Sequence, residues 1–268
     1  MSGSVIHSQS AAMVPAVYSA GQSPQLPVVI DYPAALALRQ MSMVHDELPK
    51  YLLAPEVSAL LHYVPDLRRK MLLATLWNTG ARINEALALT RGDFSLAPPY
   101  PFVQLATLKQ RIEKAARTAG RTPAGQQTHR LVPLSDTWYV SQLQTMVATL
   151  KIPLERRNKR TGRTEKARIW EVTDRTVRTW IGEAVAAAAA DGVTFSVSVT
   201  PHTFRHSYAM HMLYAGIPLK VLQSLMGHKS ISSTEVYTKV FALDVAARHR
   251  VQFAMPESDA VAMLKQLS

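Results

Sequence analysis

Apolar residues recur at helical spacing along most of the chain, which predicts a mostly helical protein. The segment 66–80 is typical, because one apolar stripe runs along it and Gly80 then supplies a stop signal. This stripe consists of Leu67, Met71, Ala74 and Trp77. The other segments predicted as helices are 33–48, 81–89, 136–150, 175–190, 201–215, 218–226, 231–241 and 257–267.

Two segments, 101–109 and 129–134, alternate instead and carry β-branched residues, which predicts strands. The stretch between them is too long for a tight hairpin and is strongly basic. A charged segment at 155–168 has no apolar period and is predicted to be a loop, and Asp174 is predicted to cap the helix that follows. The expected fold class is therefore mostly α with a small antiparallel β-sheet (α+β).

The first 30 residues contain no Asp, Glu, Lys or Arg and are rich in Ser, Ala, Pro and Gln, which predicts a flexible leader. We expect this leader, with one short helix, at 1–45, a compact domain at 46–250 and a tail helix at 251–268. The longest apolar run, at 184–190, is too short to cross a bilayer, and no secretory signal pattern begins the chain. A cytoplasmic location is therefore expected.

The net charge of the chain indicates what kind of partner it binds. The chain has 268 residues, of which 47% are hydrophobic, and its 30 Lys and Arg outnumber 19 Asp and Glu, giving a net charge of +11. This excess indicates a polyanionic partner. Nucleic acid is favoured over an anionic membrane, because no strongly cationic amphipathic helix is present. Cys is absent, which excludes disulfides and thiolate metal sites.

The stretch VTPHTFRHSYAMHML places cations in an otherwise apolar helix. Thr200 and Pro201 form a typical helix start, so His202 and Arg205 fall in the first turn, on one face. The amides of a first turn and the helix dipole favour an anion there, and a phosphate fits that role. Two alternatives stay open at this point. His202 and His206, four residues apart, could bind zinc, although no Glu lies between them, or they could be ordinary core histidines.

Two further segments carry candidate chemistry. GIPLKVLQSLMGHKSISSTEVYTKV reads as a helix, a turn that contains His228, and a second helix that contains Tyr237. In NTGARINEAL, Arg82 follows a glycine break and Glu85 lies one turn further on. Taken alone, Tyr237 would be a packing residue, and Arg82 with Glu85 would be a surface ion pair of little energetic value.

The segments TGARINEAL, HTFRHSYAMHML, LMGHKS and STEVYTKV occur in this order, with matching separations between Arg205, His228 and Tyr237. Together they resemble the signatures of the tyrosine recombinase (phage integrase) catalytic domain. The resemblance extends over residues from about 50 to 245, because YLLAPEVSALL is similar to the start of that domain and HRLVPLSD to one of its strands. It implies a site-specific DNA recombinase that works through a 3′-phosphotyrosyl intermediate, in plasmid multimer resolution or integration.

Carried over to this chain, the resemblance makes Arg82 and Arg205 the clamp on the scissile phosphate and Tyr237 the nucleophile. It makes His202 and His228 further phosphate contacts, one of them a proton carrier. Lys109, the first lysine after the strand, would be the general acid. Lys114 competes for that role, and Lys109 is favoured because strand ends hold side chains more rigidly than long loops.

This chemistry is coherent without a metal. The guanidinium groups stabilise negative charge on the phosphate oxygens, and nearby cations are expected to favour the tyrosine phenolate. The covalent intermediate conserves the bond energy for rejoining. The motifs hold no carboxylate cluster, so neither a Mg²⁺ site nor a cofactor is implied.

Two basic clusters are predicted to contact the DNA backbone, with solvated charged loops as the alternative. They comprise Arg111, Lys114, Arg117 and Arg121, and then Arg156, Arg157, Lys159, Arg160, Arg163, Lys166 and Arg168.

The implied partners are double-stranded DNA at a specific recombination site and further copies of the chain, as a tetramer on paired sites. An accessory DNA-binding protein is also considered, because members of the family usually carry a core-binding domain ahead of the catalytic domain, and few residues precede it here.

Two rival functions remain at this level. A type IB-like topoisomerase would share the chemistry without pairing two sites. A non-catalytic helix-turn-helix DNA-binding protein would use only residues 218–240 and leave Arg82, His202 and Arg205 unexplained.

Overall fold

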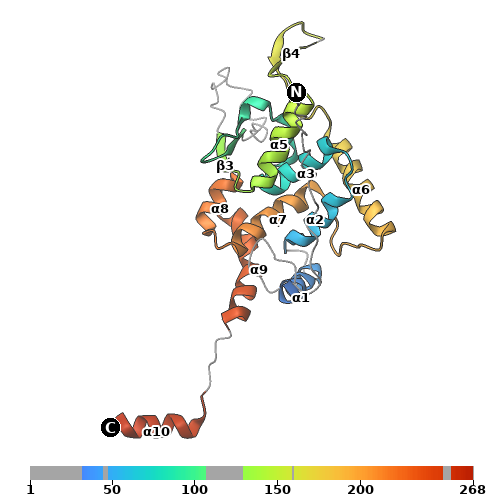
Figure 1. Cartoon of the computed structure of the whole chain (residues 1–268). Coiled ribbons are helices and arrows are strands. Elements are labelled where there is room, and N and C mark those ends of the chain that lie inside the picture. Colours follow the sequence, from blue (N-terminus) through green and yellow to red (C-terminus); the bar gives the residue numbers. More distant parts are fainter. Residues whose placement is uncertain (1–31, 45–47, 107–128, 159, 250–254, 268) are drawn as a thin grey trace, which may run out of the picture.

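The computed structural model describes residues 32–44, 48–106, 129–158, 160–249 and 255–267 (Figure 1). Helices dominate it, as the apolar periodicity predicts. The helices are α1 (Tyr32–Val44), α2 (Ala54–His62), α3 (Leu67–Thr79), α4 (Ile83–Ala88), the 3₁₀ turn η1 (Arg91–Asp93), α5 (Thr137–Thr149), α6 (Asp174–Ala190), α7 (Pro201–Tyr214), α8 (Leu219–Met226), α9 (Ser232–His249) and α10 (Glu257–Leu267). None of the described helices is long and apolar enough to cross a membrane.

The two predicted strands pair in an antiparallel sheet of order β1-β2-β3, with β1 at Phe94–Ser95, β2 at Phe102–Ala106 and β3 at His129–Pro133. The register sets Val103 opposite Val132 and Leu105 opposite Arg130. Because side chains alternate along a strand, Arg130 is buried on the same face as Val132. The predicted fold class, mostly α with a small antiparallel sheet, is confirmed.

The prediction of a loop at 155–168 was wrong. Strands β4 (Glu155–Arg157) and β5 (Thr164–Lys166) form a separate hairpin that extends from one end of the molecule (Figure 1). Charged pairing holds this hairpin, since Arg156 forms ion pairs with Glu165, at 2.8 Å, and with Glu171. Apolar alternation gives no signal here, because the side chains of both strands are polar or charged.

Local signals fixed most helix ends correctly. Gly80 ends α3 in the left-handed conformation with a φ of 59°, and the hydroxyl of Thr200 caps α7 by accepting a hydrogen bond from the amide of Thr203. The cap of α6 is Thr173 and not Asp174, which is the first residue of the helix. Both Thr173 and Asp174 have side chains that can cap a helix, and it is the hydroxyl of Thr173 that accepts the hydrogen bond from the amide of Thr176.

The buried residues form two hydrophobic clusters. The larger cluster contains residues of the helices α2, α3, α4, α5 and α6 and of the three-stranded sheet. The smaller cluster joins α1, α8, α9 and the C-terminal part of α7. Helix α7 belongs to both, because Phe204 is part of the larger cluster and Tyr208 part of the smaller one. The single apolar stripe expected on α3 was too narrow. Its residues 71–76 are all buried, because α3 packs against both α5 and α7.

Candidate active site

Charged side chains from α4, β3 and α7 meet where α7 passes from one cluster to the other. The carboxylate of Glu85 lies between two arginines and is only 2% exposed. Arg82 Nη1 donates to Glu85 Oε1 at 2.9 Å, and Arg130 donates two hydrogen bonds, from Nη2 to Oε2 at 2.6 Å and from Nη1 to Oε1 at 3.1 Å. The interpretation of Arg82 and Glu85 as a surface pair is therefore wrong, since Glu85 is buried and shared.

Burial would by itself raise the pKa of Glu85, but the hydrogen bonds and charge of Arg130, with those of Arg82, hold the pKa below its ordinary value. Glu85 is thus ionised and holds both guanidinium groups in place. Arg130 Nε also donates to the carbonyl of Leu225 at 2.8 Å, which ties β3 to the end of α8. Arg82, with its side chain 39% exposed, remains accessible from outside.

Arg205 is held by backbone carbonyls and not by a carboxylate. Its guanidinium donates to the carbonyl of Gly80 and, at 2.6 Å, to the carbonyl of Met226. The side chain is 4% exposed, and burial, followed by the charges of Arg82 and Arg130, lowers the pKa of Arg205 to about 10. Three arginines against one carboxylate leave this cluster with an excess of positive charge, which suits an anionic ligand.

Two glycines allow this arrangement. A Cβ at Gly80 would lie 2.3 Å from the ring of Tyr208, and the positive φ disfavours a side chain there as well. A Cβ at Gly227, where φ is 63°, would approach Arg130 Cδ to 3.0 Å. Gly80 therefore lets the end of α3 pack closely on Tyr208, and Gly227 lets the end of α8 come close to Arg130.

The two histidines assigned to the phosphate differ in their environment. His228, in the turn between α8 and α9, is half-buried, and its Nδ1 lies 2.9 Å from Thr234 Oγ1. Burial and then the charges of Arg205 and Arg82 lower the pKa of His228 to about 4. His202 is exposed at the start of α7, and its ring stacks on that of His206 with centroids 5.9 Å apart.

Tyr237 is 2% exposed on α9, and its hydroxyl lies 2.9 Å from Nδ1 of His206. Burial raises the pKa of Tyr237 to about 12, although the charges of Arg205 and Arg82 act in the opposite direction. The cations therefore favour the phenolate, as expected, but they do not set the net direction of the pKa change in the chain without DNA. Desolvation of the phenolate outweighs the attraction of the arginines.

Neither the role of Arg130 nor the contact between His206 and Tyr237 was predicted from the sequence. A signal for Arg130 existed, because strict alternation in β3 places this arginine on the same apolar face as Val132, where a charge requires a partner. Nothing comparable indicated His206, which became relevant only through the packing of α9 against α7.

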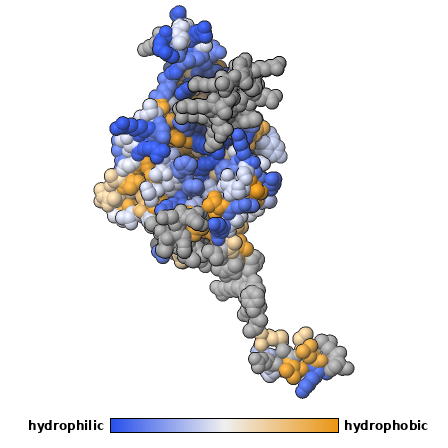
Figure 2. All heavy atoms as spheres, turned by 180° about the vertical axis from the view of Figure 1, so that it is seen from behind, coloured by the Kyte–Doolittle hydropathy of each residue, from blue (hydrophilic) through white to orange (hydrophobic). Residues whose placement is uncertain are grey.

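Several predicted residues cannot be compared with the structure. Lys109, Arg111, Lys114, Arg117, Arg121 and Lys159 lie outside the described residues. Arg157, Arg160, Arg163, Lys166 and Arg168 are exposed on or beside the β4–β5 hairpin. The tip of this hairpin is hydrophilic in Figure 2. Arg156 differs from them, because two glutamates already pair with it.

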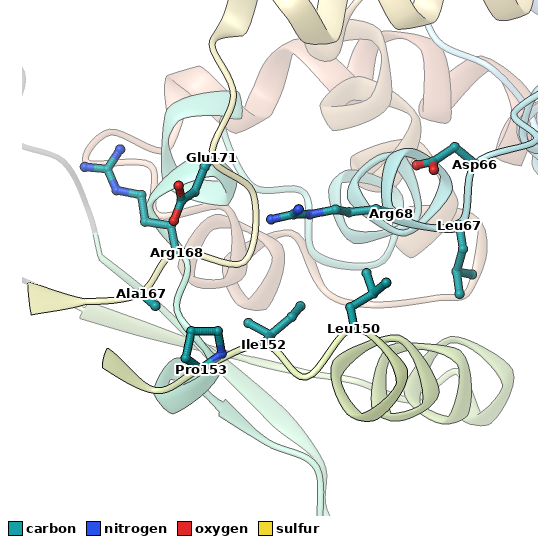
Figure 3. A pocket seen from close by; sticks show the side chains of 9 residues that line it. All are labelled: Asp66, Leu67, Arg68, Leu150, Ile152, Pro153, Ala167, Arg168 and Glu171. Atoms are coloured by element: carbon teal, nitrogen blue, oxygen red, sulfur yellow. The ribbon is translucent and has the colours of Figure 1, made fainter. Parts of the chain in front are cut away.

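A pocket of about 340 Å³ lies elsewhere, between α3, α5 and the segment after β5 (Figure 3). Its charged groups are those of Asp66, Arg68, Arg168 and Glu171, but Arg68 already donates to the carbonyl of Ile169. None of the residues that line it belongs to the arginine cluster. Within the described ranges, no group of three or more His, Cys, Asp or Glu is placed to hold a metal ion.

Comparisons with known proteins identify the family of the chain. The model of the phage integrase family matches residues 50–243. The chain is 95% identical to a protein of Escherichia coli strain K12 named "Resolvase", over the full length of both chains. It is also 34% identical to the "Tyrosine recombinase XerD" of Mycobacterium leprae, over 72% of this chain and 57% of that protein.

Solved structures share the fold at low sequence identity. The crystal structure of the XerA recombinase matches with a TM-score of 0.53 and 20% identity, over 77% of this chain and 65% of that one. The XerH site-specific recombinase bound to palindromic difH substrate matches with a TM-score of 0.53 and 19% identity. That match covers 76% of this chain but only 53% of XerH, so the chain spans about half the length of the XerH structure.

Proposed function

Because the chain belongs to the phage integrase family of tyrosine recombinases, we propose that it cuts and rejoins DNA at a specific recombination site through a phosphotyrosyl intermediate on Tyr237. The observation that carries this proposal is the juxtaposition of Tyr237 with a buried cluster of arginines. Tyr237 and Arg205 are close enough to perturb the pKa of each other, and Arg82 acts on both.

The proposed first step is attack of the Tyr237 oxygen on the scissile phosphorus, which leaves a 3′-phosphotyrosyl bond and a free 5′-hydroxyl. Arg82 and Arg205 bind the non-bridging oxygens, whose charge increases in the transition state. His202 and His228 contact the same phosphate. Arg130 acts indirectly, because it fixes Glu85, which in turn orients Arg82.

The leaving 5′-oxygen needs a proton, and we propose Lys109 as its source. A 5′-bridging phosphorothiolate tests this role, because a sulfur leaving group needs no proton. Lys109→Ala should cut ordinary DNA slowly and recover most of its rate on the sulfur substrate, whereas Lys114→Ala should show a modest, salt-dependent loss on both. Sulfur rescue of Lys114→Ala alone would move the acid to Lys114.

We further propose that residues 46–250 are the catalytic domain and that the enzyme works in the cytoplasm on double-stranded DNA. The relatives named "Resolvase" support multimer resolution as its task. Recombination needs two paired sites, so copies of the chain must assemble, as a tetramer in this proposal. The exposed side chains of Val261, Met263 and Leu264 on α10 are proposed to dock on a second copy. An accessory DNA-binding protein remains part of the proposal.

A trapping assay tests the function directly. The probes are nicked duplexes tiled across the DNA that flanks the gene, in which the nick lets the cut fragment diffuse away and prevents rejoining. The expected result is a covalent protein–DNA adduct on a denaturing gel with one group of probes only. A chain that binds these probes without any adduct would be a non-catalytic DNA-binding protein. Adducts with every probe would instead indicate topoisomerase activity.

A further inference from the structure

His206 is in contact with the atom that the proposed function makes the nucleophile. Its Nδ1 lies 2.9 Å from the Tyr237 hydroxyl, and the two ring centroids are 5.7 Å apart. The family resemblance assigned no role to His206. We propose that His206 accepts the phenolic proton of Tyr237 during attack on the phosphate and returns it during rejoining. This inference rests on the proposed function, since it concerns the same tyrosine.

The position of His206 on α7 suits this role. It follows Arg205 directly and lies one turn after His202, so a single helix presents both the phosphate ligands and the proton acceptor. This part of α7 is firmly held, because Ser207 Oγ donates to the carbonyl of Thr203 and accepts the amide of Leu52 at 2.7 Å. The acceptor is thereby fixed relative to the phosphate, whereas Tyr237 approaches from another helix.

The electrostatic setting keeps His206 neutral when no DNA is bound. Burial and then the charges of His202 and Arg205 lower the pKa of His206 to about 4. His228 faces the same group from the turn before α9. A neutral imidazole with its hydrogen on Nε2 has a free lone pair on Nδ1, which accepts the Tyr237 O–H. Tyr237 therefore rests as a protonated and buried phenol.

A bound phosphodiester changes this balance. Its negative charge, held by Arg82 and Arg205, offsets the cations that disfavour the imidazolium, so protonation of His206 becomes easier once DNA is in place. In the step itself, the bond from the Tyr237 oxygen to phosphorus forms and the bond from phosphorus to the 5′-oxygen breaks. The phenolic proton moves to Nδ1 of His206, and the leaving oxygen takes its proton from the general acid. Rejoining reverses each transfer.

The test compares His206→Asn with a matched control, His211→Asn, in the full chain. Asn keeps a hydrogen-bond acceptor near the position of Nδ1 but takes up no proton at neutral pH. His211 lies on the same helix, is partly buried and packs on Trp77, outside the arginine cluster. With the probe that gives the wild-type adduct, His206→Asn should form adduct about 100-fold more slowly. His211→Asn should retain the wild-type rate.

Two readouts separate proton transfer from mere positioning of the tyrosine. Without an acceptor the reactive species is the ionised tyrosine, so the rate of His206→Asn should rise about tenfold per pH unit between pH 7 and 9. A ring-fluorinated tyrosine at position 237 is a stronger acid and should restore most of the lost rate. A rate that stays low and flat, without rescue, would overturn the inference and make His206 a positioning residue.

The outcomes also separate this inference from the proposed function. If the wild-type chain forms no adduct with any probe, the proposed function fails and this inference fails with it. If the wild-type chain forms adduct and His206→Asn forms it equally fast, only this inference is overturned.

Discussion

The two hydrophobic clusters support different residues of the candidate active site. The larger one carries Arg82, Glu85 and Arg130 on helix and strand elements that pack into the main core. The smaller one carries Tyr237 on α9, and α1 and α8 complete it. Arg82, which would hold the phosphate, thus stands with the larger cluster, whereas Tyr237, which would attack it, stands with the smaller one.

Substitutions in the two regions should therefore affect the stability of the fold and the cleavage reaction to different extents. The region around Arg82 depends on the buried ion pair between Glu85 and Arg130, and loss of either partner leaves an uncompensated charge in the core. The nucleophile side depends on the hydroxyl of Tyr237, which is hydrogen-bonded to His206 and whose removal costs little stability but all of the covalent chemistry. Helix α7 links the two sides, because Arg205 belongs to the arginine cluster and the adjacent His206 contacts Tyr237.

The largest effect should come from Tyr237→Phe, which removes only the hydroxyl. We expect no covalent adduct at all, unchanged DNA binding and a loss of unfolding free energy of about 1 kcal/mol, since one buried hydrogen bond disappears. Gel trapping, a binding titration and urea denaturation measure the three quantities. Residual adduct in this variant would show that another residue attacks, and the proposed mechanism would fall.

Arg130→Ala and Arg82→Ala should separate stability from chemistry. Arg130→Ala leaves the buried Glu85 poorly compensated and should cost about 3–5 kcal/mol of unfolding free energy. Arg82 is 39% exposed, so Arg82→Ala should cost under about 1 kcal/mol while adduct formation falls about 100-fold or more. Urea denaturation and trapping under native conditions measure both. Equal destabilisation by the two variants would contradict the division drawn here.

Acid should weaken the smaller cluster through its histidines. The pKa values of His206 and His228 are both lowered to about 4, below the ordinary value of 6.5, so the unfolded chain binds more protons between these limits. The contribution of both neutral histidines to the free energy of unfolding is therefore complete above about pH 6.5, and it is lost progressively as the pH falls to about 4. Thermal unfolding at pH 7.5, 6 and 5 should show a falling Tm. The double variant with His206→Asn and His228→Asn should flatten that slope, and an unchanged slope would assign the effect to other groups.

The smallest effect on cleavage should come from deleting residues 256–268. If α10 docks on a second copy, this deletion should leave binding to one site and cleavage near the wild-type level but reduce pairing of two sites. Native gels with one or two duplexes distinguish these quantities. Equal loss of binding and pairing would instead indicate that the deletion disturbs the fold of its own chain.

The sequence by itself determined most of the local structure. Apolar periodicity located most of the helices, with α2 as an exception. The Thr200–Pro201 start fixed the beginning of α7, and Gly80 fixed the end of α3. These features depend on neighbouring residues, whose steric and hydrogen-bonding preferences are set within a few positions. The ordered motifs also identified the family, because they preserve the residue types that phosphate chemistry requires.

The contacts between charged and polar groups that lie far apart in the chain depend on the tertiary structure. Arg130 reaches Glu85 from a strand far along the chain, and His206 reaches Tyr237 because α9 packs on α7. The same packing set the protonation state of the tyrosine, since burial raised its pKa although the nearby cations act in the opposite direction. Ion pairs and desolvation depend on distances and buried volume in three dimensions, which local sequence preferences do not specify.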